Sequence, residues 1–337
     1  MGLAFLSLVS QSRPTKLSAL DSLCGSGVSL GARRSQQSEM VNHLKALIRY
    51  ALFPTNFCVA IAVACLALER QWHPGLVLAG ITLVTVAVIL VAERVSPFHE
   101  VWNEARGDVG TDLLHATLSQ LLLPFLLGIA IQAAIITFAA DAASGTYTGV
   151  WPRQLTMFLQ VPLALLVTQF GEYWWHRLAH ESPFFWRFHA THHSPRRLYW
   201  LNAGRFHPID TAIAVSISAG TLGLLGAGPE VILVMTAWII VHGLYQHCNI
   251  DLRLGPLNYI FSMAELHRWH HSLHLEEANN NYGNNIILWD IVFGTMYWPK
   301  DRQPSAKIGI DMPSFPESFW GQIKSPFEWA RLNDKEE

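Results

Sequence analysis

Charged residues are scarce in this 337-residue sequence, and their scarcity excludes several classes of protein. Asp, Glu, Lys and Arg make up 14% of the chain, and hydrophobic residues make up 51%. Soluble globular domains usually carry about 25% charged residues. The formal net charge is −2 and the basic residues form no dense run, so nucleic acid is not a predicted partner. This composition favours an integral membrane protein.

Cysteine is also rare, and its placement excludes two kinds of cross-link. The four cysteines, Cys24, Cys58, Cys65 and Cys248, form no CxxC pair, and two of them lie within an apolar run. Neither a disulfide framework nor a zinc ribbon is therefore indicated. The sequence Trp72-His73-Pro74-Gly75 matches part of an HPGG haem motif. The polar joint that contains it is too short for a haem domain.

Six hydrophobic runs predict an all-α, multi-pass membrane protein. A helix needs about 20 apolar residues to span a bilayer, and the first four runs are about that long. The last two runs are shorter and read as a helical hairpin joined by Gly226 to Pro229. Pro124 predicts a kink in the third run. The runs are residues 50–68, 75–92, 113–140, 155–175, 209–225 and 231–246.

The distribution of basic residues predicts the orientation in the membrane. An even number of spans places the N-terminus, the polar loop 93–112 and the C-terminus on one face. All of the 23 Lys and Arg residues except Arg70 and Arg153 lie on that face. Because loops rich in Lys and Arg stay in the cytoplasm, we expect the C-terminus to be cytoplasmic.

Histidines are concentrated on that same face. HRLAH holds His176 and His180 one helical turn apart, so both side chains can point at one centre. Two later motifs, HATHH (189–193) and HRWHH (267–271), share the spacing HxxHH. Neutral imidazole is the commonest metal ligand. The clusters therefore predict a metal-binding cap, and the repeated motif predicts two metals.

Several polar residues near these clusters have two open interpretations. Glu172 precedes His176 by one turn, so its carboxylate could orient that imidazole or could reach water at the end of the helix. His207 could be a ligand or a structural residue. The isolated histidines His43, His73, His99 and His115 read as structural or interfacial.

Two redox metals held by imidazoles, with one position open, can bind and cleave dioxygen and so oxidise an unactivated C–H bond. Hydroxylation or desaturation would follow, and both need two external electrons. No haem, flavin or ferredoxin motif is present in the sequence, so a separate electron donor is expected. Five arginines could dock an acidic donor or could anchor lipid phosphates: Arg177, Arg187, Arg196, Arg197 and Arg205.

The region from Leu155 to Pro299 closely resembles the fatty acid hydroxylase/sterol desaturase superfamily. The resemblance rests on HRLAH, HATHH, RFHP around His207, YQHCNI around His247, HRWHH and NYG…LWDIVFGT. It implies a membrane oxygenase with two iron ions, dioxygen as co-substrate and a lipid substrate. The implied donor is of the cytochrome b5, ferredoxin or flavin-reductase type.

The same resemblance implies a ligand set. Some members of the superfamily have HxxxH at the end of the last hairpin, whereas His242 and His247 are five residues apart here, so the role of His242 stays open. The implied ligands are His176, His180, His189, His192, His193, His247, His267, His270 and His271.

The expected domains are a disordered or targeting leader (1–39), an additional membrane hairpin with its loop (40–111), the catalytic domain (112–300) and a tail (301–337). The leader would also be absent if translation began at Met40. The principal alternative function is a histidine-rich metal transporter, although a transporter would hold ligands near mid-bilayer. A zinc protease is weaker, since HRLAH lacks the glutamate of HExxH. A sterol-like or fatty acyl lipid is the expected substrate.

Overall fold

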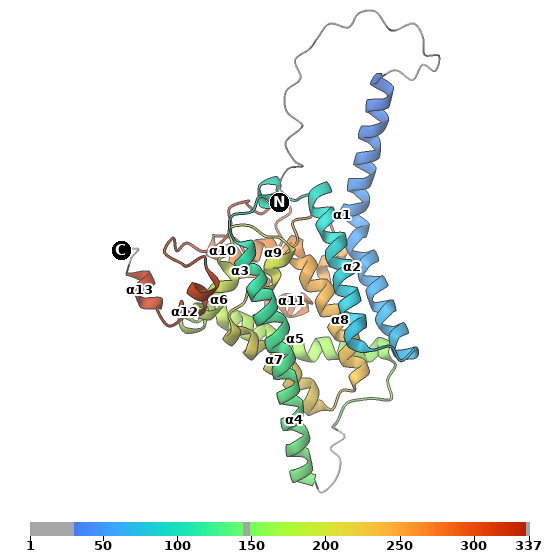
Figure 1. Cartoon of the computed structure of the whole chain (residues 1–337), viewed down its shortest axis with the longest axis vertical. Helices are drawn as coiled ribbons and strands as arrows, with labels where there is room; N and C mark the ends of the chain where they lie inside the picture. The colour runs from blue at the N-terminus through green and yellow to red at the C-terminus, as the bar shows by residue number, and fades with distance from the viewer. Residues whose placement is uncertain (1–29, 144–148, 335–337) are drawn as a thin grey trace, which may run out of the picture. The chain divides into compact units, whose positions relative to one another are not determined.

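The computed structural model describes residues 30–143 and 149–334, and these form helices joined by turns and loops, as predicted for an all-α protein (Figure 1). They fall into two compact units, one that ends at Leu44 and one from Lys45 onward, and the second holds every feature considered below. The longer helices are α1 (Leu30–Glu69), α2 (Pro74–Val95), α4 (Leu123–Ala143), α5 (Met157–Glu181), α6 (Pro183–His193), α7 (Pro208–Leu225) and α8 (Pro229–Gln246).

Shorter helices connect or follow these. Before α4 come η1 (Glu100–Asn103), α3 (Val109–Leu114) and η2 (His115–Leu122). After α6 come η3 (Trp200–Gly204), η4 (Gly255–Tyr259), α9 (Ala264–His270), α10 (Leu275–Ala278), α11 (Leu288–Phe293), α12 (Phe319–Lys324) and α13 (Trp329–Asn333).

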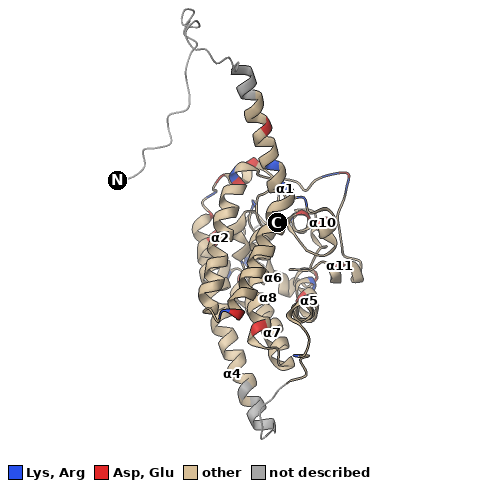
Figure 2. Ribbon diagram, turned by 90° about the vertical axis from the view of Figure 1, so that its right-hand side faces the viewer, with Lys and Arg blue, Asp and Glu red and all other residues tan. Residues whose placement is uncertain are grey.

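Within the part of the chain that the structure describes, five helical stretches are long and apolar enough to cross a membrane, one fewer than the six expected. They are Ser35–Glu69, Pro74–Val95, Val109–Ile135, Pro208–Leu225 and Pro229–Gln246. Charged residues are sparse along these stretches (Figure 2).

The run that is missing from this set is the fourth expected one, 155–175, which corresponds to α5 and is helical but more polar than the other runs. Gln160, Gln169 and Glu172 interrupt its apolar sequence and are all buried. Figure 1 shows α5 running across the direction of α4 and α8. Buried polar groups need partners from neighbouring helices, so one face of α5 packs inside the bundle while Phe158, Phe170 and Trp174 are exposed.

Two expected boundaries differ from those observed. Residues 1–29 of the predicted leader lie outside the described residues, and residues 30–39 belong to α1. The sequence from Leu30 to Phe53 contains no proline, so nothing separates the polar start of this helix from its apolar continuation. The predicted loop 93–112 is also shorter, since α2 continues to Val95 and α3 begins at Val109.

The third run is one continuous helix with a π-helical segment in place of a simple proline kink. The segment η2 (His115–Leu122) ends two residues before Pro124. A proline has no amide hydrogen and its ring crowds the preceding turn, and a π-bulge accommodates such a disturbance. The segment turns His115 into the protein, where it is fully buried.

The apolar core lies where α1, α2, α5 and α8 meet. Its buried members include Phe53 of α1, Ile89 of α2, Leu165 of α5 and Val241 of α8. On the other side of the bundle, α7 packs along α4 and α5. The start of α5 lies beside the end of α7, because the Trp151 amide donates to the Leu225 carbonyl over 2.8 Å.

Polar segments distant in the sequence meet in one cap at the other end of α5. The amide of Phe98 donates to the Asn249 carbonyl, the Thr111 hydroxyl to the Glu317 carbonyl, and the Trp102 indole to the Ala306 carbonyl. Two buried ion pairs, Arg197 with Asp108 and Arg205 with Asp112, join the loop after α6 to the region around α3. Removing one partner of such a pair costs about 3–5 kcal/mol.

Candidate metal centre

The cap brings all nine predicted ligands into two groups. His176, His180, His189, His193 and His270 form the five-histidine group, and His192, His247, His267 and His271 form the four-histidine group. Within each group, one imidazole nitrogen from every residue lies within 4.8 Å of the others.

Four elements supply these side chains. α5 supplies His176 and His180 from its last turns, and α8 ends at His247. α6 supplies the HATHH histidines and α9 with its C-cap supplies those of HRWHH. Adjacent histidines on a helix point about 100° apart, so each HxxHH motif divides between the groups. The two groups are therefore interleaved through α6 and α9.

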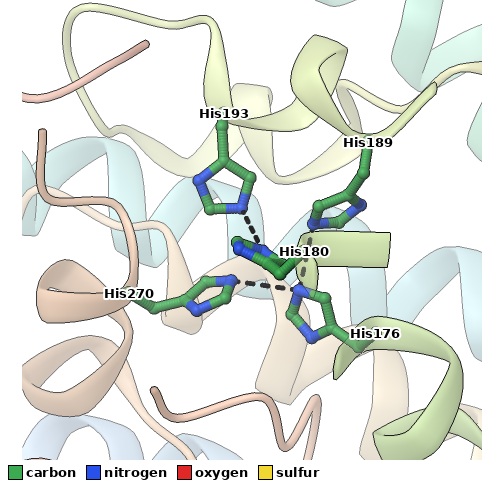
Figure 3. A group of neighbouring side chains, drawn as sticks. All are labelled: His176, His180, His189, His193 and His270. Carbon is green, nitrogen blue, oxygen red and sulfur yellow. Dashed lines mark hydrogen bonds between the residues drawn. The ribbon is translucent and has the colours of Figure 1, made fainter. Parts of the chain in front are cut away.

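The imidazoles of the five-histidine group converge through their Nε2 atoms (Figure 3). The Nε2 atom of His176 lies 3.0 Å from that of His189 and 3.0 Å from that of His270. The Nε2 atoms of His180 and His193 are 3.1 Å apart. Such separations place several nitrogen atoms around one small volume.

The outer nitrogens of this group fix where the protons lie. His176 Nδ1 is 2.6 Å from the Tyr282 carbonyl oxygen, and His270 Nδ1 is 2.7 Å from the Asn280 carbonyl oxygen. A carbonyl oxygen only accepts, so both Nδ1 atoms carry hydrogen and both Nε2 atoms present lone pairs. Two lone pairs 3.0 Å apart repel each other unless a cation lies between them. The donor set therefore fits a metal ion.

His192 and His247 of the four-histidine group follow the same rule, whereas the Nδ1 atoms of His267 and His271 are buried without a partner among the described residues. His247 Nδ1 donates to Asn202 Oδ1 over 3.0 Å, and the amide of Asn202 is oriented by its own bond to the Arg197 carbonyl. His192 Nδ1 lies 3.2 Å from the Arg205 carbonyl oxygen. The Nε2 atom of His267 is 2.9 Å from those of both His247 and His271.

Burial favours the neutral form of several of these imidazoles, which is the form that binds a metal. His180 is half-buried and the other eight are buried. Loss of water lowers the pKa of His193, His267 and His271 well below the usual value, and lowers the pKa of His270 and of His247 to about 3. A proton therefore cannot serve as the missing cation near neutral pH.

Asp210 is a functional residue that sequence reasoning missed. Its carboxylate lies in the first turn of α7 and accepts from His189 Nδ1 over 2.7 Å and from the Trp175 indole over 2.9 Å. Carboxylates in this position orient a histidine ligand and raise its basicity. A signal was present, since Asp210 is the only charged residue in the apolar run 209–225.

Buried polar residues fix the backbone around the ligands. The Arg268 guanidinium donates to the Cys248 and Ile250 carbonyls, which ties α9 to the segment after His247. Asp290 accepts from the amides of Tyr282 and Gly283 at 2.7 and 2.8 Å. Asp290 therefore fixes the backbone of the loop whose Tyr282 carbonyl orients His176.

Comparison with known proteins decides the family. A family model described as fatty acid hydroxylase matches residues 161–295. The chain is 39% identical over 288 residues to an ornithine lipid hydroxylase of Rhizobium tropici, which is 85% of this chain and 86% of that protein. This chain belongs to the fatty acid hydroxylase family.

More distant relatives of this fatty acid hydroxylase family member match smaller regions. The alkylglycerol monooxygenase of Danio rerio is 28% identical over 192 residues, covering 52% of this chain and 40% of that protein. The methylsterol monooxygenase 1 of Rattus norvegicus is 30% identical over 129 residues, covering 36% and 41%. No solved structure matches. The predicted family and oxidoreductase class are confirmed.

Three predicted site residues lie outside both histidine groups. Glu172 accepts from Gln169, Ser218 and Asn284 and bonds no histidine, because the Nδ1 of His176 is already paired with a carbonyl. Its predicted role in orienting His176 is therefore not what the structure shows. His207 accepts from the Ile209 amide as the N-cap of α7. His242 is buried among aromatic rings.

The five arginines proposed to dock an electron donor are not equivalent. Arg197 and Arg205 are 3% exposed and paired with Asp108 and Asp112, so their expected availability for docking is wrong. Their basic side chains hold the cap together. Arg196 is exposed, and Arg177 pairs with Glu181 on the surface of α5.

Proposed function

We propose that this protein is a membrane-bound diiron monooxygenase that hydroxylates a C–H bond of a polar lipid. The proposal rests chiefly on the two interleaved histidine groups, in which imidazole nitrogens converge. Hydrogen bonds at Nδ1 of His176, His270 and His247 fix the tautomer of these ligands. Two groups support two metals, and an all-imidazole set suits iron better than magnesium or calcium. The metal count and identity are part of the proposal.

The reaction couples the lipid to dioxygen. One oxygen atom enters the C–H bond as a hydroxyl, and two electrons and two protons convert the other to water. Bound iron would supply the activation of dioxygen. The chain supplies the buried imidazoles that would hold the iron. Asp210 accepts the hydrogen of His189 Nδ1, on the side of the ring that faces away from the histidine group.

Hydroxylation is favoured over desaturation because the relatives described above are named hydroxylase or monooxygenase. An aminolipid such as ornithine lipid is the first substrate to test. The Rhizobium tropici relative aligns with 85% of this chain, whereas the family model begins at residue 161. An alignment of that length extends into the N-terminal hairpin.

A separate protein is proposed to deliver the electrons to the cytoplasmic cap. A cytochrome b5, a ferredoxin or a flavin reductase would serve this step. The cytoplasmic orientation rests on the concentration of Lys and Arg in the segments that form the cap. Metal transport is less well supported, since the ligands lie at and beyond the ends of the spans.

Lipid profiling by mass spectrometry tests this function. Cells with the gene should contain a lipid class that is 16 mass units heavier than its counterpart in cells without it, since one oxygen atom is added. Growth under ¹⁸O₂ should raise this difference to 18. A loss of two mass units instead would indicate desaturation, and no oxygen-dependent difference in any lipid class would contradict an oxygenase.

A further inference from the structure

One face of α8 carries buried polar atoms without hydrogen-bond partners. Trp238, His242 and Tyr245 are four and three residues apart, so they form one stripe along the helix. The Trp238 Nε1, both ring nitrogens of His242 and the Tyr245 hydroxyl are buried, and none has a partner in the part of the chain that the structure describes. His242 and Tyr245 are both fully buried.

The N-terminal hairpin contributes a facing stripe. On α1, Phe53 and Phe57 flank Asn56, whose Oδ1 atom is also buried and unpartnered among the described residues. The Phe53 ring centroid is 5.4 Å from that of Tyr245 and 6.3 Å from that of His242. Phe57 meets Trp238 edge-on at 4.6 Å. Helices α1 and α8 therefore meet through these two stripes.

Phe261 packs against the rings of both stripes. Its ring lies 5.3 Å from Phe53, 5.3 Å from Phe57, 5.4 Å from Trp238 and 6.1 Å from His242. Its neighbour Ser262 has a buried hydroxyl that lacks a partner among the described residues. Buried polar atoms without partners thus lie on three elements that meet through packed aromatic rings, and we call these residues the enclosure.

Such a gathering is unfavourable for a core that only packs. Buried polar groups are nearly always hydrogen-bonded, and an unsatisfied one destabilises the fold. Apolar residues of similar size would pack at these positions without the free-energy cost of an unsatisfied polar group. His242 is also absent from both histidine groups, so metal binding does not explain its two free nitrogens.

The enclosure is close to the metal centre. His242 precedes the ligand His247 by five residues on the same helix, which is about 7–8 Å along the axis at 1.5 Å per residue. If one group of a lipid binds at His242, a C–H bond that is a few covalent bonds from that group could thus lie near the four-histidine group.

We propose that this enclosure, formed by Asn56, Trp238, His242 and Tyr245, binds the amide of an N-acylated lipid substrate. Trp238 and Tyr245 offer donors, Asn56 Oδ1 offers an acceptor, and a neutral His242 offers one of each. An amide matches this set because its carbonyl oxygen accepts and its N–H donates. The inference rests on the proposed function and assigns the N-terminal hairpin to substrate recognition.

Binding to purified full-length protein tests the assignment without requiring turnover. The probe is N-palmitoyl ornithine in detergent micelles, and methyl palmitate, which has no N–H, is the comparison. The amide lipid should bind the wild type at least about tenfold more tightly than the ester, the factor that one hydrogen bond of about 1.4 kcal/mol provides. Equal binding of the two lipids would overturn the proposal.

His242→Phe and Tyr245→Phe should each remove this preference while bound metal stays unchanged. His242→Phe should melt at the same or a higher temperature, because it replaces an unsatisfied polar ring with an apolar one. Tyr259→Phe, at an exposed tyrosine, is the matched control. Preference retained in both variants, or lost together with metal or thermal stability, would overturn the assignment.

The two proposals fail differently. A wild type that binds the amide lipid selectively but hydroxylates no lipid would contradict the proposed function and leave the enclosure intact. A wild type that hydroxylates lipids with no preference for the amide would refute the enclosure alone.

Discussion

At the scale of single residues, the hydrogen-bond partners of several imidazoles determine which ring nitrogen points into its histidine group. Tyr282 and Asn280 provide carbonyl oxygens, which leave His176 and His270 no choice of tautomer. Asp210 fixes the tautomer of His189 in the same way, because its carboxylate oxygen accepts from His189 Nδ1. A negative charge on that position also strengthens the imidazole as a donor to a cation.

Asp210→Asn should therefore weaken metal binding while the fold is kept. The amide has the same shape but lacks the charge, and loss of such an outer partner typically lowers metal affinity by about 10- to 100-fold. Competition with a metal-binding dye measures the affinity of purified protein. Asp301→Asn changes an exposed carboxylate and is the control. Equal affinity in both variants would show that Asp210 does not tune the ligand.

The repeated histidine spacings were sufficient to predict that the three motifs contribute to one metal-binding cap, and the family resemblance added His247 to the ligand set. The sequence could not predict how HATHH and HRWHH divide between two groups. That division depends on where α6 and α9 lie relative to α5 and α8, which no local pattern encodes. Asp210 was missed because its partner His189 is 21 residues away.

At the scale of elements, the π-helical segment η2 links the membrane bundle to the cap. It directs His115 inward, where Nδ1 is 2.9 Å from the Phe206 carbonyl and Nε2 is 3.0 Å from Gln322 Oε1. The imidazole joins η2, the loop before α7 and α12. The reading of His115 as a structural histidine agrees with these contacts.

His115→Phe should reduce stability and leave the ligands in place. Phenylalanine fills the volume but cannot donate, and a neutral imidazole donates from one ring nitrogen, so one buried acceptor loses its donor at a cost of about 1–3 kcal/mol. Thermal unfolding in detergent should show a lower melting temperature than the wild type. His274→Phe alters an exposed histidine and should not change it. An unchanged melting temperature in His115→Phe would contradict this role.

Helix α5 shows that hydropathy alone does not reveal how a helix packs. Its sequence is long and largely apolar, and it was predicted to span the membrane. In the structure the polar residues Gln169 and Glu172 are satisfied inside the bundle, by Asn285 and Ser218 among others. Burial against other helices and burial in lipid give similar patterns in a sequence, and only the partners distinguish them.

At the scale of the whole molecule, the polar segments gather at one end of the bundle and hold both histidine groups there. The loop before α3, the loop after α6 and the segment after α8 are linked by Asp108, Arg197 and Asn249. The start of α5 and the end of α7 meet at the other end, through Arg153 and the Gly226 carbonyl. The membrane would lie between them.

This arrangement predicts opposite labelling of two engineered cysteines. In a background with all four native cysteines replaced by alanine, Val150→Cys should react with a membrane-impermeant maleimide added outside intact cells. Ala105→Cys, in the cap, should react only after the membrane is permeabilised. Both positions are exposed. The reverse pattern would place the metal centre on the other side of the membrane.

The metal content of active enzyme tests the central claim most directly. We predict two iron ions per chain in preparations that hydroxylate lipid with a reductant supplied. His192→Ala and His270→Ala change different histidine groups, so each should lose most of one metal and abolish hydroxylation. His73→Ala, outside both groups, should keep both metals and the activity. One iron per chain in the active wild type would contradict the dinuclear centre.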